Sequence, residues 1–435
     1  MYQKWIELGL SKGLKALEIY AVKSISLNVT VYQGKVDKCV KSEVEQATIR
    51  GIYRGKMGSV SIENFNDQDV SNYLDELIAN AKVVTVSEPA IIYKGAKKYP
   101  TVADEKSDLS EVPLSAKIDF AKKLEAEVLK NKYCAQVQST IYIESQTVTR
   151  IVNSKGLNLT RNANYCGAYA VGVFAKGEDI QTAYDIKIVK NFHELDPVAM
   201  GKATVKKGVA KLGGSSLPSG EYPVVFDNTT FADILSVYSS IFSAEACYRN
   251  LTPLKGKVGE KIALESITLV DDPLNKKALF KIPFDDEGVP CKKKKLIDKG
   301  VFTGFINNLK SAKLLGDKPS GNGFHGSVSP TNLILEPGKL SLKDLLAPIK
   351  DGIYITELSG LHAGVNTSSG DFSLQAAGFK IKDGKLDHPV KMIVVSGNFF
   401  TLLNNVAGIG KDLKLNEDGL GSPSVHISSL MIGGQ

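Results

Sequence analysis

The sequence predicts an α+β protein in which two related units of helix and antiparallel sheet precede a β-rich C-terminal domain. Three observations support this fold class. The order of one helix, several alternating strands and a second helix occurs twice, in residues 1–110 and 111–215, as a duplication would produce. From residue 220 to residue 435, short β-branched runs bounded by glycine or proline dominate. A chain of 435 residues also exceeds what a single hydrophobic core usually serves.

The first unit is expected to begin with a helix from residue 1 to about residue 20, where apolar and charged positions alternate as on an amphipathic helix. Residues 26–64 then alternate with period two, and Gly34 and Gly55 suit hairpin turns. A second helix is expected to begin at the run Asp67–Asp69, because an Asp side chain can cap its free amides. The apolar residues of that helix recur at helical spacing, at Val70, Leu74, Leu77, Ile78 and Ala81.

The second unit follows Glu88–Pro113, a segment of prolines and charges that predicts a surface linker. A helix is expected over residues 114–131, and alternating strands over residues 135–190 with turns at Ser154–Gly156 and Lys176–Glu178. The stripe on that helix consists of Ile118, Ala121, Leu124 and Val128. A last helix starts at Pro197 and is stopped by Gly213 and Gly214.

The C-terminal domain begins after a second linker, Ser215–Gly220. A strand at Tyr222–Phe226 leads to a helix capped by Asp227 or Asn228. The rest of the domain is expected to consist mainly of short strands and turns. The helical exceptions are residues 311–316, residues 341–349 and a segment from Phe399 to about Gly408. Gly408 and Gly410 are interpreted as the stop of that last helix and not as a phosphate loop.

The composition, with 43% hydrophobic and 23% charged residues, is that of an ordinary globular protein. No apolar run approaches the roughly 20 residues that span a bilayer. The N-terminal residues lack the apolar block of a signal peptide, so we expect a cytoplasmic protein without a membrane partner. The five cysteines are far apart and form no CxxC pair, which argues against disulfides and a structural zinc site.

The net charge of +7 is modest for this length. Its densest basic run, Lys292–Lys295, is surrounded by Asp285, Asp286, Glu287 and Asp298, and no aromatic-interleaved pattern accompanies it. We interpret this run as a solvated strand face. Nucleic acid is therefore not an expected partner.

The stretch most suggestive of function is Gly360–Phe379, GLHAGVNTSSGDFSLQAAGF, between the predicted strands IYITEL and PVKMIVVSG. We expect it to be one long ordered connection, because Phe372, Leu374 and Phe379 need somewhere to pack. The candidates for lining a peptide path or chamber are polar residues of this stretch and one histidine outside it: His362, Asn366, Ser369, Asp371 and His325. Asn366 and Asp371 are expected to hold backbone amides of the loop, as Asn and Asp do in tight turns.

Four motifs in this order resemble the PmbA/TldE branch of the TldD/PmbA family, whose members were once called modulators of DNA gyrase. They are FSAEACYRN (Phe242–Asn250), FDDEGVP (Phe284–Pro290), the stretch Gly360–Phe379, and SGNFFTLLNNVAGIGKDL (Ser396–Leu413). The resemblance is densest over residues 222–435. It implies that the chain pairs with a TldD-like metalloprotease subunit, which holds zinc, and that the assembly cleaves unfolded polypeptides.

In the TldD branch, the resemblance implies, a helix carries HExxxH and a late cysteine completes the metal site. The matching window here, Asp233–Ala246, contains no histidine, and the tail has no cysteine. Glu245 alone is not a metallopeptidase site. We therefore expect no catalytic residue, metal or other cofactor in this chain, which would be the non-metal subunit of the peptidase. A homodimer of the isolated chain stays open.

Two other functions stay open from the residues. His325 in GNGFHGSVSP and His362 are flanked by glycines, and with Asp371 they would make a two-histidine, one-carboxylate metal site in a self-sufficient metallopeptidase. A gyrase modulator that binds protein or DNA is the third alternative. The remaining histidines are interpreted as structural or surface residues: His193, His388 and His426.

Overall fold

A computed structural model describes residues 1–85, 88–103 and 107–435. The predicted linker Glu88–Pro113 lies partly outside these residues, at 104–106. The described part contains no helix or strand but is not purely surface, because Ile92 and Leu109 are buried in two hydrophobic clusters. Among the described residues, every helix is too short or too polar to span a lipid bilayer.

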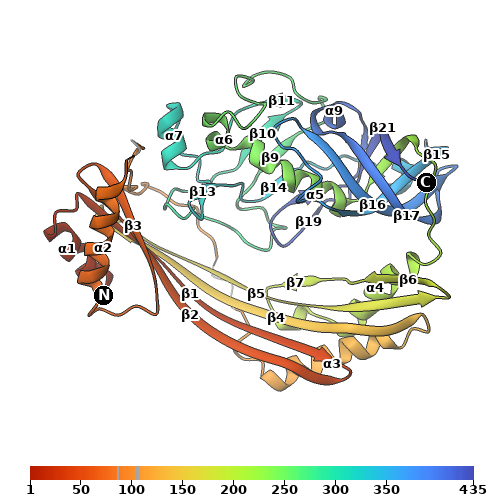
Figure 1. Cartoon of the computed structure of the whole chain (residues 1–435), viewed down its shortest axis with the longest axis horizontal. Helices are drawn as coiled ribbons and strands as arrows, with labels where there is room; N and C mark the ends of the chain where they lie inside the picture. Colours follow the sequence, from red (N-terminus) through yellow and green to blue (C-terminus); the bar gives the residue numbers. More distant parts are fainter. Residues whose placement is uncertain (86–87, 104–106) are drawn as a thin grey trace.

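The N-terminal half forms one antiparallel sheet of long strands in the order β3-β2-β1-β4-β5-β6, with β7 also pairing β5. Its strands are β1 (Ala16–Tyr32), β2 (Lys35–Tyr53), β3 (Lys56–Glu63), β4 (Cys134–Asn153), β5 (Asn158–Lys176), β6 (Asp179–Ala183) and β7 (Lys187–Val189). The helices of this half are α1 (Tyr2–Ser11), α2 (Val70–Val83), α3 (Leu114–Leu129), η1 (Phe192–Glu194) and α4 (Pro197–Ala210). Figure 1 shows the strands as a curved layer that passes beneath the C-terminal domain.

The predicted helix over residues 1 to about 20 is wrong beyond Ser11. Gly13 adopts a positive φ of 92°, which ends the helical path, and β1 begins at Ala16. The α2 prediction is confirmed for its apolar positions, all five of which are buried. Its N-cap is Asp69, within the predicted start Asp67–Asp69, but the Asp69 side chain does not make the expected capping hydrogen bond.

The two predicted units share this sheet, since β1 and β4 pair antiparallel at its centre from Glu18↔Asn153 to Val31↔Thr140. Each unit contributes its first strand to the centre and its later strands to one side. A duplication followed by pairing of the two first strands would produce this symmetry, and we keep the duplication as a proposal. The period-two pattern of the sequence carries no signal for which strands become neighbours.

The two faces of the sheet differ. On β1, Leu17 and Ile19 pack into the cluster with α1 and α2, whereas Leu27 and Val29 pack into the cluster with α3. These residues all have odd numbers and therefore share one face. The even-numbered face carries Tyr20, which contacts the C-terminal domain.

The C-terminal half contains two six-stranded sheets and one short hairpin, β12-β13. One sheet has the order β17-β16-β15-β8-β21-β18 and the other β11-β10-β9-β14-β20-β19. The strands of the first are β8 (Gly220–Phe226), β15 (Asp351–Ser359), β16 (Asp371–Lys382), β17 (Lys385–Asn398), β18 (Val406–Ile409) and β21 (Val425–Gly433). The strands of the second and of the hairpin are β9 (Leu269–Asp271), β10 (Lys294–Asp298), β11 (Val301–Phe302), β12 (Gly323–Phe324), β13 (Ser327–Val328), β14 (Leu333–Leu335), β19 (Lys414–Leu415) and β20 (Gly421–Ser422).

The helices of this half are α5 (Asn228–Tyr238), η2 (Ser239–Phe242), α6 (Ala244–Tyr248), α7 (Leu309–Leu315), α8 (Leu342–Leu346) and α9 (Phe399–Asn404). The predicted cap of α5 is confirmed at Asp227, whose carboxylate accepts hydrogen bonds from the amides of Thr229 and Thr230. The interpretation of Gly408 and Gly410 as a helix stop is wrong. The helix ends at Asn404, and β18 pairs with β21 through Gly408.

The basic run Lys292–Lys295 is a solvated face at three of its four positions, where the lysines are exposed. Lys294 is the exception. Its ammonium lies 3.2 Å from the fully buried carboxylate of Asp271 and 2.6 Å from Oδ1 of Asn322. Side chains alternate between the two faces of β10, and this alternation turns Lys294 inward. Because all four residues of the run are lysines, the sequence pattern does not distinguish the inward one.

Replacing Lys294 by Gln is therefore expected to lower the free energy of unfolding by about 1–3 kcal/mol, because Asp271 loses a charged partner in the core. Lys292→Gln, in the same run but exposed, should change it by less than about 0.5 kcal/mol. Urea unfolding of both variants measures the difference. Equal stability of the two variants would contradict the distinction between these lysines.

Candidate functional site

The predicted connection Gly360–Phe379 is shorter than expected. Only residues 360–370 form the loop, because β16 begins at Asp371. The apolar residues that were expected to pack within a loop lie on this strand, where Phe372 and Leu374 are buried. They belong to the core cluster of the C-terminal domain. The alternation from Phe372 to Ala376 was the signal for a strand.

The loop closes on itself through side chains. Asn366 Oδ1 accepts hydrogen bonds from the amides of Ser368 and Ser369 at 3.0 and 3.2 Å, as expected. Asp371 does not hold backbone amides, contrary to the prediction. Its carboxylate accepts from Asn398 Nδ2 at 2.9 Å and from Ser369 Oγ at 2.7 Å. These two hydrogen bonds, that of Asn398 first, lower the pKa of Asp371.

The base of the loop is fixed by Tyr238, the last residue of α5. Its hydroxyl donates to the carbonyl oxygens of Gly370 and Asp371 at 2.8 and 3.0 Å. The Tyr238 ring is buried and stacks on Phe399, with ring centroids 4.3 Å apart. Burial raises the pKa of the Tyr238 hydroxyl, which therefore stays protonated and able to donate. Tyr238 belongs to the window Asp233–Ala246, so the loop and that window lie side by side.

The structure brings Asn366, Ser369 and Asp371 together but not the two histidines. His362 is exposed on the loop. His325 is exposed in the turn between β12 and β13, with a positive φ of 48°, and its Nδ1 lies 3.9 Å from Asp286. Within residues 1–85, 88–103 and 107–435, no group of three or more His, Cys, Asp or Glu side chains is arranged to hold a metal ion. Those residues therefore do not fit the metal site of the self-sufficient alternative.

The window Asp233–Ala246 also does not fit a zinc ion. It covers the end of α5, η2 and the start of α6. Burial, with the nearby charges of Asp227 and Glu417, raises the pKa of Asp233 to about 6. Glu245 forms an ion pair with Arg249 at 2.7 Å on the surface of α6. Neither carboxylate has a histidine beside it in the window.

The other histidines have local roles. His193 Nδ1 lies 2.9 Å from Asp108, and His388 Nδ1 lies 3.0 Å from Asp387. His426 is not the surface or hydrogen-bonded residue that the strand pattern suggested. It is buried, its Nε2 makes no hydrogen bond to the described residues, and burial lowers its pKa.

A second cluster of functional interest was not predicted from the sequence, where FDDEGVP counted as a family motif and its acidic residues as neighbours of the lysine run, with no structural role assigned to them. Asp285 is fully buried, and its carboxylate accepts from the amides of Glu287, Val289 and Gly323 at 2.9–3.0 Å. Burial, with the charge of Glu287, raises the pKa of Asp285 to about 7.

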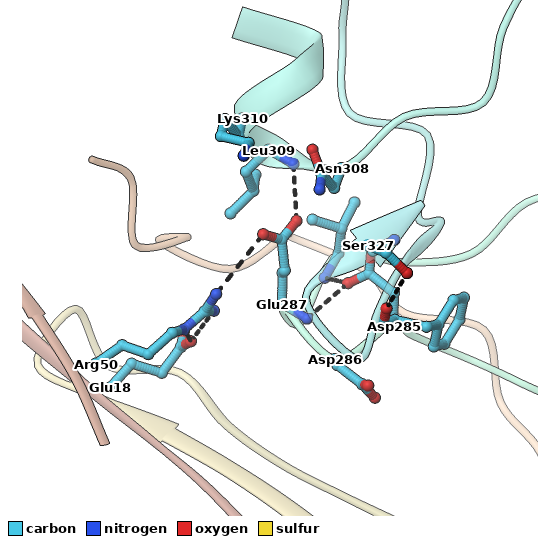
Figure 2. Close-up of polar contacts among 12 residues, drawn as sticks. Glu18, Arg50, Asp285, Asp286, Glu287, Asn308, Leu309, Lys310 and Ser327 are labelled. Atoms are coloured by element: carbon cyan, nitrogen blue, oxygen red, sulfur yellow. Dashed lines mark hydrogen bonds and ion pairs between the residues drawn. The ribbon is translucent and has the colours of Figure 1, made fainter. Parts of the chain in front are cut away.

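The next two carboxylates reach outward from this turn. Asp286 binds Arg161 Nη2 at 2.5 Å and Tyr20 Oη at 3.1 Å, both on the N-terminal sheet. Figure 2 shows Glu287 between the start of α7, where it accepts from the Leu309 amide at 2.7 Å, and Arg50, 3.8 Å away. Arg50 is in turn paired with the buried carboxylate of Glu18. FDDEGVP is thus a joint between the sheet and the C-terminal domain.

The fold and this site define a class of protein in which a long antiparallel sheet is joined by an acidic turn to a C-terminal domain with two further sheets. Family models described as PmbA/TldA metallopeptidase domain 1, central domain and C-terminal domain match residues 17–81, 107–212 and 219–434. The chain belongs to the PmbA/TldD family.

Curated relatives span nearly the whole chain. A metalloprotease of Methanothermobacter thermautotrophicus is 28% identical over 99% of this chain and 98% of its own. The metalloprotease PmbA of Escherichia coli O157:H7 is 24% identical over 99% and 94%.

Solved structures agree in fold. A putative modulator of DNA gyrase from Thermotoga maritima has a TM-score of 0.93 at 28% identity, with 99% of both chains covered. TldE from Thermococcus kodakarensis has a TM-score of 0.90 at 25% identity, with 100% of both chains covered.

Proposed function

We propose that this chain is the TldE-like subunit, without a metal of its own, of a cytoplasmic peptidase whose TldD-like partner holds zinc and cleaves unfolded peptides. The observation that carries the proposal is the absence of histidine from Asp233–Ala246 in a chain of this family. The contact of Tyr238 with Gly370 supports a role for the loop 360–370. That contact keeps the loop beside the helix that would face the partner's metal site.

In this role the chain's own residues bind and orient, and do not perform chemistry. The loop is held in one conformation by hydrogen bonds of three of its side chains, and it would form one side of the peptide path. Asn366 accepts from a loop amide, and Asp371 accepts from Ser369 and from Asn398. His362, exposed on the same loop, and His325, at the β12-β13 turn, are proposed to line the peptide path. An extended peptide bound mainly through its backbone would be accepted with little regard to its sequence.

The first test is metal analysis and cleavage of an unfolded protein by the purified chain, with and without a co-expressed TldD-like subunit. The chain alone is expected to hold no stoichiometric zinc and to cleave nothing. One equivalent of zinc in the chain alone, lost in His362→Ala, would instead favour the self-sufficient enzyme.

The second test uses Asp371→Ala in the mixed complex. We expect cleavage to fall severalfold, because Ser369 and Asn398 lose their shared acceptor and the loop loosens. The amount of complex, measured by size-exclusion chromatography, should stay nearly unchanged. Asp387→Ala, at an exposed carboxylate beside His388, is the matched control. Normal cleavage in Asp371→Ala, or complete loss of assembly, would remove the loop from the proposed site.

A further inference from the structure

One edge of the N-terminal sheet is uncovered over a long distance. Strand β3 pairs only with Gln46–Tyr53 of β2, so Lys35–Glu45 has β1 on one side and no strand on the other. In the part of the chain that the structure describes, the single backbone hydrogen bond on that outer side runs from the Asn64 amide to the Glu45 carbonyl oxygen, 2.9 Å. Figure 1 shows this part of β2 at the margin of the curved sheet.

This edge presents both unpaired backbone groups and apolar side chains. Because the Glu45 carbonyl points outward and backbone groups alternate along a strand, Glu43, Lys41 and Cys39 also direct theirs outward. Val36 and Val40 are 39% and 43% exposed. A long open edge with exposed valines is a template for another strand.

The edge sequence is complementary to itself. If two copies of KVDKCVKSE (Lys35–Glu43) run antiparallel with Cys39 opposite Cys39, Lys35 faces Glu43 and Asp37 faces Lys41, each twice by symmetry. The outward backbone groups of Cys39 then meet in a hydrogen-bonded pair. Within one copy, Asp37 is the extra residue of a β-bulge, because Thr30 pairs with Lys38 and Val31 pairs with Val36. Across the proposed axis, Asp37 of one copy faces Lys41 of the other, which lies on the regular part of β2.

Pairings of the two copies in neighbouring registers bring like charges together. A centre at Val40 places Asp37 opposite Glu43, and a centre at Lys38 or Lys41 places a lysine opposite itself. If the two-fold axis lay beyond Lys41, the partner strand would clash with β3, which pairs with β2 from Gln46 onward. With the centre at Cys39, the partner's hairpin tip at Gln33–Gly34 ends beside Glu45 and avoids β3.

We propose that Lys35–Glu43 of β2 is a docking edge for a second copy of this chain, with the two-fold axis at Cys39. Two N-terminal sheets then join into one continuous sheet across the axis. The charges of this edge select the register as well as preventing random association. This inference does not depend on the peptidase role.

A charge-swap series on the full chain tests the register by analytical ultracentrifugation. Lys41→Glu places like charges opposite each other at two symmetry-related positions and should raise the dimer Kd at least about tenfold. The double variant Asp37→Lys/Lys41→Glu exchanges the charges within each pair and should restore the dimer. Lys176→Glu, the same charge change at the exposed last residue of β5, should leave the Kd unchanged.

Cross-linking gives an independent measurement. A hydrogen-bonded antiparallel pair has Cα atoms about 5.5 Å apart, within the range of a disulfide. Copper–phenanthroline in air, as the oxidant of the two thiols, should therefore join two copies through Cys39. The cross-link should disappear in Cys39→Ser and persist in Cys134→Ser.

Three results would overturn the proposal. The first is a chain that is monomeric at high concentration and forms no Cys39 cross-link. The second is a dimer that the charge swap does not restore. The third is a Cys39 cross-link that forms only with a co-expressed TldD-like subunit, because the occupant of the edge would then be that subunit.

Discussion

Replacing Arg161 by Ala is expected to lower the free energy of unfolding by about 3–5 kcal/mol, because it leaves the nearly buried carboxylate of Asp286 without its charged partner. Arg161 also donates to the Phe284 carbonyl oxygen at 2.5 Å, and its guanidinium lies 5.4 Å from the Phe284 ring centroid. One side chain of β5 thus holds both the backbone and the carboxylate of the acidic turn. Its loss should loosen the C-terminal domain from the sheet.

Hydrogen exchange of the amides from Phe284 to Val289 measures that loosening, and denaturant unfolding measures the stability. The matched control is Arg249→Ala, which breaks an exposed ion pair with Glu245 on α6 and should cost less than about 1 kcal/mol. If both variants lose similar stability, or if exchange at the turn is unchanged in Arg161→Ala, FDDEGVP does not join the sheet to the C-terminal domain through Arg161.

The sequence predicted elements well where a local rule acts. The stripe from Val70 to Ala81 gave α2, and the carboxylate of Asp227 gave the start of α5. The prediction failed where two local signals compete. In residues 12–20 the alternation of apolar and charged positions suits a helix, but the same residues also suit a strand. There the positive φ of Gly13 and the burial of Leu17 and Ile19 in the sheet decide the structure.

The candidate site was predicted in part for a related reason. Asn366 acts on amides two and three residues away, so its role is local and visible in the sequence. The partner of Asp371 is Asn398, on the next strand, and register alone brings them together. The contacts of Asp286 with Arg161 and Tyr20 span more than 100 residues. No spacing pattern in a single sequence encodes such contacts.

Asp285 should make the stability of this protein fall as the pH rises from about 4 to about 7. In the unfolded chain an aspartate releases its proton near pH 4, whereas burial raises the pKa of folded Asp285 to about 7. Between these values the folded state binds more protons than the unfolded state, so each rise in pH favours unfolding. A shift of this size corresponds to a loss on the order of 4 kcal/mol at and above pH 7.

The comparison of wild type with Asp285→Asn isolates this effect, since the amide cannot titrate. The substituted amide side chain will not reproduce all three backbone hydrogen bonds, so the variant is expected to be less stable at pH 4–5, but its stability should depend less on pH. Asp179→Asn is the control, because hydrogen bonds from Lys391 first, and then Gln181, lower the pKa of Asp179 to about 2. The contribution of Asp179 to stability is therefore lost only below about pH 4. Its variant should keep the wild-type slope of unfolding free energy against pH between pH 4 and 7.

Urea unfolding at half-unit intervals of pH measures this slope for the wild type and both variants. Equal slopes for wild type and Asp285→Asn would show that Asp285 is already ionised in the folded protein throughout this range.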